Sequence, residues 1–171
     1  MKKTTCIILL FLMILTVSGC RNVNKDKIEY TLSDDGTYYI LSYVGANVEN
    51  LVIPEYYNGK PVLEIGDYAC SHKSGPLHND SKIKSVQIEA NLTKIGDSAF
   101  QICNNLVDIT IPNSVVSIGN EAFFECDALC VVNIGNSVST IGDRAFSGCS
   151  SLGSITIPAS VRTIGEYAFK S

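Results

Sequence analysis

The sequence has no tryptophan and only two histidines, His72 and His78, which stand close together in one segment. Histidine is the residue most often used in general acid–base catalysis, so the rest of the chain lacks the usual proton-transfer group. The chain also has no G-x-S-x-G, H-E-x-x-H or C-x-x-C motif and no glycine-rich phosphate loop. These absences argue against an enzyme, and they give no reason to expect a cofactor.

Cationic residues and long apolar runs are also scarce. The chain has 13 Lys and Arg against 17 Asp and Glu, a formal net charge of -4, so it lacks the basic footprint of a nucleic-acid-binding protein. The longest apolar run, Cys6 to Val17, is shorter than the about 20 residues that span a bilayer. With 46% apolar and 18% charged residues, the composition suits one compact domain with a core.

The start of the chain has the layout of an export signal. A Lys-Lys pair precedes the apolar run, and small residues follow it. The letters VSGC, ending at Cys20, resemble the lipobox of bacterial lipoproteins, in which the cysteine is acylated and begins the mature chain. The resemblance implies a signal peptide at 1–19, a tether at 20–27 and a protein outside the cytoplasm, lipid-anchored to a bacterial membrane or cell surface. The alternative is an ordinary secreted protein in which Cys20 has no role.

Beyond the tether, the chain repeats one pattern at a step of 23 residues. The pattern is C-x-x-L-x-x-I-x-I-P-x-S-V-x-x-I-G-x-x-A-F, and its Ile-Gly, Ala-Phe, Cys and Leu columns all keep the same step. The Ile-Gly glycines are Gly66, Gly96, Gly119, Gly142 and Gly165. The first interval is 30 residues long, so that copy carries an insertion. Several columns on one step indicate a stack of similar units.

Each copy contains the signals of a strand, a turn, a short extended piece and another turn. The I-x-I alternation has the period of a strand, which a proline such as Pro112 then ends. We expect the glycine after it, for example Gly119, to adopt a backbone conformation closed to other residues. The next residue, Asp97, Asn120 or Asp143, stands where its side-chain oxygen would cap a short helical turn. One copy cannot bury its apolar face alone, so neighbouring copies must cover one another.

These columns resemble the BspA-like class of leucine-rich repeats found in bacterial surface proteins, most specifically between Leu92 and Phe169. The resemblance implies an α/β repeat fold, a right-handed leucine-rich-repeat solenoid with short helical turns. It also implies that the I-x-I strands form a parallel β-sheet on the concave face. The repeats cover 51–171, about five rungs of which the last is incomplete.

The segment ahead of the repeats predicts a cap. Residues 28–44 alternate apolar and polar on both sides of Asp35-Gly36, a strong hairpin signal. We expect 28–50 to form an N-terminal β-hairpin cap, because the first rung of a solenoid has no preceding neighbour. Four tyrosines near this end either form an epitope or, as we favour, pack on the first rung. They are Tyr38, Tyr39, Tyr56 and Tyr57.

The insertion brings four metal-ligand types together, Cys70, His72, His78 and Asp80. Their spacing matches no zinc module, and a flexible loop would lose its freedom on binding a metal. We therefore favour exposed loop histidines beside a small buried cysteine, and we assign no metal site.

The cysteine column, Cys103, Cys126 and Cys149, allows two interpretations. Stacked Cα atoms about 5 Å apart lie within disulfide range, but parallel Cβ vectors do not give the torsion of roughly 90° that a bridge needs. We expect a ladder of buried free thiols. Cys130 falls one place after the leucine column, so we expect an outward thiol that either cross-links to another molecule or has no role.

The outward strand positions are small and mostly polar. They lack the Trp, Tyr and Arg that dominate interface energies, so we expect weak or multivalent contact through them. The candidate binding face consists of Lys84, Gln87, Asp108, Thr110, Val131, Asn133, Ser154 and Thr156. The hypothesis is a non-catalytic module that, as the family resemblance implies, binds or adheres to a protein of a host or neighbouring cell. The alternative is a structural spacer, or the N-terminal fragment of a longer surface protein that presents another domain.

The lipobox predicts that Cys20→Ala removes the lipid, because the Cys20 thiol is the acylation site. In a bacterial host fed an alkyne-tagged fatty acid, the unaltered chain and a Cys6→Ala control should take up the tag, as seen by fluorescent labelling on a gel. The Cys20→Ala chain should take up none. Labelling of that variant to the level of the control would contradict the prediction.

Overall fold

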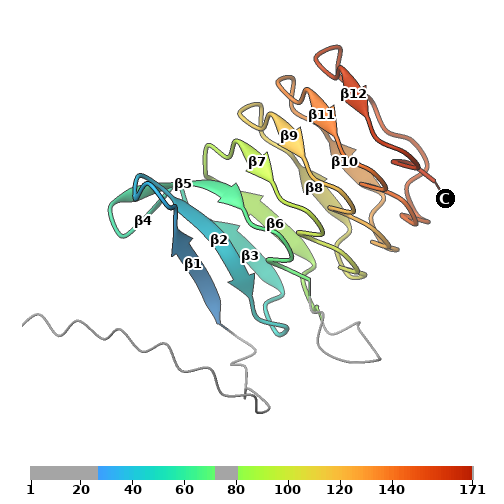
Figure 1. Cartoon of the computed structure of the whole chain (residues 1–171). Coiled ribbons are helices and arrows are strands. Elements are labelled where there is room, and N and C mark those ends of the chain that lie inside the picture. The colour runs from blue at the N-terminus through green and yellow to red at the C-terminus, as the bar shows by residue number, and fades with distance from the viewer. Residues whose placement is uncertain (1–26, 72–80, 171) are drawn as a thin grey trace, which may run out of the picture.

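The computed structural model describes residues 27–71 and 81–170, and Figure 1 shows them as a coil of stacked rungs that begins with a hairpin. Twelve strands occur in these ranges, and they fall into two groups. The first group forms one sheet and comprises β1 (Ile28–Leu32), β2 (Tyr39–Val44), β4 (Tyr56–Tyr57), β5 (Lys60–Ile65), β7 (Lys94–Ile95), β9 (Ser117–Ile118), β11 (Thr140–Ile141) and β12 (Thr163–Ile164). The second group forms two pairs and comprises β3 (Asn50–Ile53), β6 (Ser85–Ile88), β8 (Asp108–Thr110) and β10 (Val131–Asn133).

The continuous sheet follows the Ile-Gly strands. Its order is β1-β2-β5-β7-β9-β11-β12, and every pairing along this order from β2 onward is parallel, while β4 pairs antiparallel with β5 beside it. The I-x-I strands form only the parallel pairs β3–β6 and β8–β10. The expected parallel pairing of the I-x-I strands is therefore confirmed for these two pairs, and a longer parallel sheet, which was not expected, runs along the Ile-Gly strands. The hand of the coil and the concavity of its faces stay predictions.

The first two strands form the hairpin that the Asp35-Gly36 signal predicts. β1 pairs antiparallel with β2, with a bulge at Glu29 and Tyr30, and β2 continues the sheet by pairing with β5. Asp35 organises the loop between them, because its Oδ1 accepts hydrogen bonds from Ser33 Oγ at 2.7 Å and from the Thr37 backbone N–H at 3.0 Å. These bonds favour the ionised carboxylate and hold the pKa of Asp35 below its usual value.

The expected short helical turns are wrong. The residues described include no helix, and the segment after each Ile-Gly pair is a series of hydrogen-bonded turns. The second residue after the glycine lies in the left-handed region, with φ of 53° at Ser98, 54° at Glu121 and 52° at Arg144. A left-handed residue interrupts a right-handed helix and costs about 1–2 kcal/mol for a residue with a Cβ. In this conformation the Ser98 N–H donates to Asn120 O of the next rung at 2.8 Å, not to a carbonyl of its own rung.

The Asp/Asn column is an inter-rung ladder rather than a set of helix caps. Asp67 Oδ1 accepts from the Asp97 N–H at 2.8 Å, and Asp97 Oδ1 accepts from the Asn120 N–H at 2.8 Å. Asn120 Oδ1 continues with the Asp143 N–H at 2.9 Å, and Asp143 Oδ1 with the Glu166 N–H at 2.8 Å. The expected capping role is therefore wrong. Each side chain accepts a hydrogen bond from the backbone N–H at the same position of the following rung, not from a helical turn in its own rung.

The glycine column is required by close approach rather than by conformation. Gly119 is absent from the glycines with positive φ, which corrects the expected reason for it. A Cβ added at Gly119 would lie 2.6 Å from the Gly96 carbonyl carbon and 2.7 Å from the Asp97 nitrogen. Real Cβ atoms essentially never come within 3.0 Å of such atoms, and backbone cannot move aside as a side chain can. The glycine thus lets adjacent rungs pack backbone to backbone.

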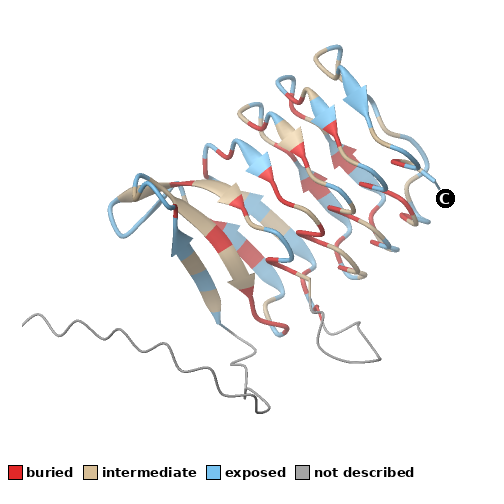
Figure 2. Cartoon of the chain, in the orientation of Figure 1, coloured by how far each residue is buried: buried red, intermediate tan, exposed pale blue. Residues whose placement is uncertain are grey.

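The core is a set of residue columns that each following rung covers. Figure 2 shows buried residues recurring at the same place in successive rungs. The Phe100, Phe123, Phe146 and Phe169 rings stack with centroids 5.0–5.5 Å apart and interplanar angles of 4–5°. Coverage by a neighbour decides burial: Ile141 is 0% exposed, whereas Ile164, in the last described rung, is 48% exposed.

The cysteine column lies inside this core as free thiols, as expected. Cys126 Sγ donates to Phe100 O at 3.0 Å, and Cys149 Sγ donates to Phe123 O at 3.1 Å. Burial raises the pKa of Cys103 to about 12 and that of Cys149 to about 11. These thiols are therefore protonated at neutral pH and poor nucleophiles.

Replacing Gly119 with alanine should lower the free energy of unfolding by about 3 kcal/mol, because a methyl group would force two backbones apart. Equilibrium urea unfolding followed by circular dichroism measures this change. Gly153→Ala is the matched control, since a Cβ at Gly153 meets nothing within 4 Å and should change stability by less than about 0.5 kcal/mol. Equal effects of the two substitutions would refute the close-packing explanation.

Among the five described cysteines, only Cys130 should react with iodoacetamide in the folded chain at pH 8, because it alone is exposed. The four buried thiols should become alkylated only in denaturant, with peptide mass spectrometry assigning each site. Native-state alkylation of Cys126 as fast as that of Cys130 would show that the thiol column is not sealed.

Candidate functional site

The candidate binding face lies on neighbouring strands of the I-x-I layer. Lys84 precedes β6, Gln87 lies on β6, Asp108 and Thr110 on β8, and the remaining residues on or after β10. All eight residues of the face are exposed. Asp108 is in register with Val131, and Thr110 with Asn133, so the structure brings these four into one continuous surface.

Four of the seven polar residues of this face are bonded through their side chains, namely Lys84, Gln87, Thr110 and Asn133. Lys84 Nζ pairs with Glu49 Oε2 at 2.8 Å, and Gln87 Nε2 donates to Glu89 Oε1 at 2.9 Å. Asn133 Nδ2 donates to Thr110 Oγ1 at 3.3 Å. A ligand that used these groups would first have to replace existing bonds, which reduces the net gain from each contact.

A small apolar area accompanies these polar groups. Val107 and Val131 are 45% and 47% exposed. Cys130, which directly precedes Val131, is exposed as well. Cys130 Sγ donates to Val107 O at 3.5 Å. The outward thiol expected at this position is thus confirmed, and its use by a partner stays a prediction.

The weak metal set is only partly described. Cys70 occupies the position that phenylalanine holds in the later rungs, and it is fully buried there. This burial raises the pKa of its thiol well above the usual value. His72, His78 and Asp80 lie outside the residues that the structure describes. Within 27–71 and 81–170, no three His, Cys, Asp or Glu residues are grouped so that they could hold a metal ion.

The N-terminal tyrosines mostly pack on one another and on the first rung. Tyr57 stacks on Tyr30 with centroids 4.4 Å apart and meets Tyr39 edge to face at 5.0 Å. The Tyr38 hydroxyl donates to Glu64 Oε1 at 2.6 Å, and this bond raises the pKa of Tyr38 to about 12. Tyr56 is 59% exposed and Tyr57 36% exposed, but Tyr57 has both ring contacts whereas Tyr56 has none among the described residues. The arrangement supports the packing interpretation over an aromatic epitope.

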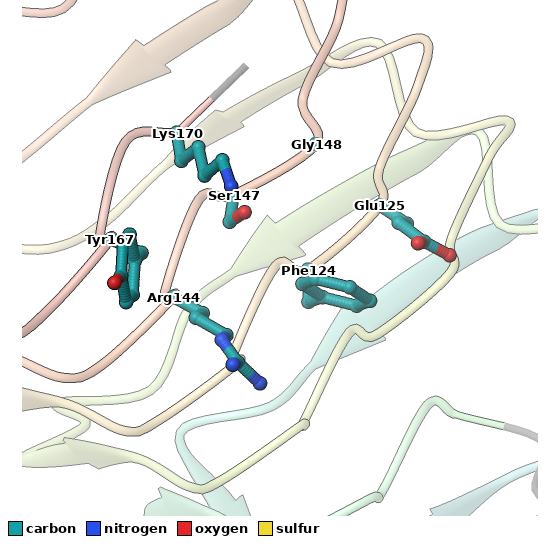
Figure 3. Close-up of a pocket in the computed structure, with 7 residues that line it drawn as sticks. All are labelled: Phe124, Glu125, Arg144, Ser147, Gly148, Tyr167 and Lys170. Atoms are coloured by element: carbon teal, nitrogen blue, oxygen red, sulfur yellow. The ribbon is translucent and has the colours of Figure 1, made fainter.

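The turns that follow the Ile-Gly pairs stack on one another, and we call them the turn layer. A second candidate site, which sequence reasoning missed, is a hollow of about 510 Å³ in this layer. Figure 3 shows the seven residues around it, Phe124, Glu125, Arg144, Ser147, Gly148, Tyr167 and Lys170. A signal for it exists in the repeat: the position after the phenylalanine column holds Phe124, then the much smaller Ser147, then Lys170. A small residue between two large ones leaves a gap between rungs.

The part of the chain that the structure describes contains no helix long and apolar enough to cross a membrane. A search of curated proteins found no match to the chain. Among solved structures, the leucine-rich repeat protein TpLRR of T. pallidum is 28% identical with a TM-score of 0.75, over 84% of this chain and 64% of that one. The pneumococcal vaccine antigen PcpA is 23% identical with a TM-score of 0.60, over 86% of this chain and 46% of that one, and shows a likeness of fold alone.

The chain thus spans less than two thirds of the length of either structure. The model of the BspA type leucine-rich repeat region matches residues 63–171 in six copies, which is more than half of the chain. The matched range contains the glycine, phenylalanine and cysteine columns that build the rungs. The chain belongs to the BspA type leucine-rich repeat family.

Proposed function

We propose that the chain is a non-catalytic leucine-rich-repeat lipoprotein of the bacterial surface that binds or adheres to a protein ligand. The observation that carries this proposal is the division of every rung into constant inward columns and variable outward positions. Stacked rungs place those outward side chains on a rigid surface at intervals of about 4.8 Å, so a ligand can contact several rungs at once.

The surface location has two supports. The chain belongs to the BspA type leucine-rich repeat family, and the resemblance of its repeat columns to that class implies a bacterial surface protein. The chain begins with an apolar segment that ends in Val-Ser-Gly-Cys, the pattern of a lipid-modified cysteine. A lipid at Cys20 would hold the rungs outside the cytoplasm while leaving their outward face accessible.

A binding role fits the chemistry of the rungs better than catalysis. Charged groups on the described surface are solvated or paired singly, as in Lys84 with Glu49 and Arg144 with Glu121. The cysteine column is buried and protonated, so it offers no nucleophile. A protein ligand would contact several small outward side chains at once, which suits weak contacts added over rungs.

Binding should weaken when the outward column Thr110, Asn133 and Thr156 is changed to arginine, because three long cationic side chains would prevent close approach. The chain, immobilised at its N-terminal end, is mixed with extracellular-matrix and cell-envelope proteins, and captured proteins are quantified by mass spectrometry. Capture should fall by at least about tenfold, the effect of losing more than 1.4 kcal/mol of contact energy.

The matched control changes Thr93, Thr140 and Thr163 to arginine, since all three are exposed near or on the other sheet. This control should capture the same proteins as the unaltered chain. Undiminished capture by the Thr110, Asn133 and Thr156 variant would exclude this face, and absence of specific capture by the unaltered chain would refute the binding function and favour a spacer.

A further inference from the structure

The turn-layer hollow is formed by small residues between large ones. Its floor is Ser147 and Gly148, and the equivalent positions of the preceding rung are Phe124 and Glu125. Gly148 has φ of 76°, and a Cβ there would come within 3.0 Å of Glu125 Cγ. Glu125 and Ile102 hold the same column at φ of 54° and 59°, so it is the contact with Glu125 that disfavours a side chain at Gly148.

Two cations border this hollow, and neither is fully neutralised. Lys170 forms no salt bridge within the described residues, and its Nζ lies 5.4 Å from the centre of the Tyr167 ring. Arg144 Nη1 is 3.4 Å from Glu121 Oε1, longer than the 2.7–2.9 Å usual for charge-assisted hydrogen bonds. Glu121 also accepts from Gln101 at 3.1 Å, so its charge is shared.

The acids nearby limit how much negative charge a ligand can bring. Glu125 stands on one wall of the hollow, and Asp143 and Glu166 border the adjoining depression that shares Arg144 and Tyr167. One Asp143 oxygen is already occupied by the Glu166 N–H at 2.8 Å. When Glu121, the partner of Arg144, is counted, two cations face two acids, so Lys170 is the one cation of the hollow without an acidic partner among the described residues, and a polyanion is disfavoured.

The residue types around the hollow are those that dominate protein interfaces. Tyr and Arg are enriched among the residues that contribute most to binding, and Tyr167 and Arg144 border this hollow with the partly exposed Phe124. The candidate sheet face has none of these types. In the view of Figure 3, the Lys170 ammonium points toward Ser147, whereas the Arg144 side chain runs away from Ser147 on the opposite side, and Tyr167 and Phe124 lie on the other two sides.

We propose that this hollow receives one acidic side chain of the protein partner. The carboxylate lies over Ser147 and bonds the Lys170 ammonium, the Arg144 guanidinium attracts it from the other side of the hollow, and an adjacent apolar side chain of the partner covers the Phe124 ring. This inference rests on the proposed protein-binding function and names the chemistry of one contact. Glu125 acts against a second acid, so the partner segment carries a lone acidic residue with apolar neighbours.

The test is an NMR titration of the full ¹⁵N-labelled chain with the peptide acetyl-Gly-Leu-Glu-Leu-Gly-amide. The peptide should shift the backbone amide signals of Ser147, Gly148 and Lys170 in a saturable manner. The glutamine analogue, which is equal in shape but uncharged, should bind at least about tenfold more weakly, since it loses the charge-assisted bond to Lys170 and the attraction of Arg144. Equal shifts with both peptides would overturn the proposal.

Substitutions give the sign of each contribution. Lys170→Gln and Arg144→Gln should each weaken binding of the glutamate peptide several-fold, and both residues are exposed, so the fold is retained. Glu125→Gln should strengthen binding about two- to threefold because it removes a repulsive charge. Lys94→Gln, an exposed cation on β7 outside the hollow, is the control and should leave binding unchanged. Weaker binding by Glu125→Gln would contradict the assigned charges.

Two further outcomes would also overturn the proposal. N-acetylneuraminic acid or glucuronic acid could shift the same signals more strongly than the peptide, which would make the ligand a carboxylated sugar. In the capture assay, a chain with both Lys170→Gln and Arg144→Gln could retain all protein binding. That last result would dismiss the hollow while leaving the binding function intact, whereas failure of the unaltered chain to capture any protein would dismiss the function.

Discussion

The structure depends on the close contact of backbone with backbone at the glycine column. Gly119 lies so near Gly96 and Asp97 that no side chain fits between them. This approach sets the spacing at which Gly119 N–H reaches Ile95 O at 2.9 Å and Asn120 N–H reaches Asp97 Oδ1 at 2.8 Å. The same spacing is compatible with the offset stacking of the phenylalanine rings at 5.0–5.5 Å. Three kinds of interaction therefore share one repeat distance.

That shared distance separates the stable part of each rung from the variable part. Residues that contact the neighbouring rung must suit it on both sides, so the columns accept few side chains. Positions outside these columns meet no such demand, and they differ between copies, as Phe124, Ser147 and Lys170 do. Differences between neighbouring rungs create hollows and charges without disturbing the core.

Much of the rung can be predicted from the sequence because it is repeated. The step of 23 residues, the two strand segments, the buried cysteine column and the hairpin at Asp35-Gly36 all have local signals that the copies reinforce. The prediction of a helix cap at Asp97 is wrong. An aspartate after a turn has the same local sequence pattern whether its side chain bonds its own chain segment or the next rung. The role of Gly119 was wrong for the same reason: conformation is a local property, and close approach is not.

The turn-layer hollow could not be predicted from any one copy. It depends on the difference in side-chain size between Phe124 and Ser147, and on the placement of Arg144 and Lys170 from two rungs around one gap. The consensus of the repeat does not show such differences, because they occur at its variable positions. A comparison of the copies column by column would have identified the small residue, but the charges that face it require the stacked geometry.

Amide hydrogen exchange of the folded chain tests the central claim that in-register backbone ladders hold the rungs together. The Gly119, Asn120 and Gly142 amides, each bonded to the preceding rung, should exchange only through opening of several rungs and be strongly protected. The Tyr167 and Phe169 amides, which have no backbone acceptor among the described residues, should exchange much faster. Exchange of Gly119 and Asn120 as fast as that of Tyr167 would contradict the account.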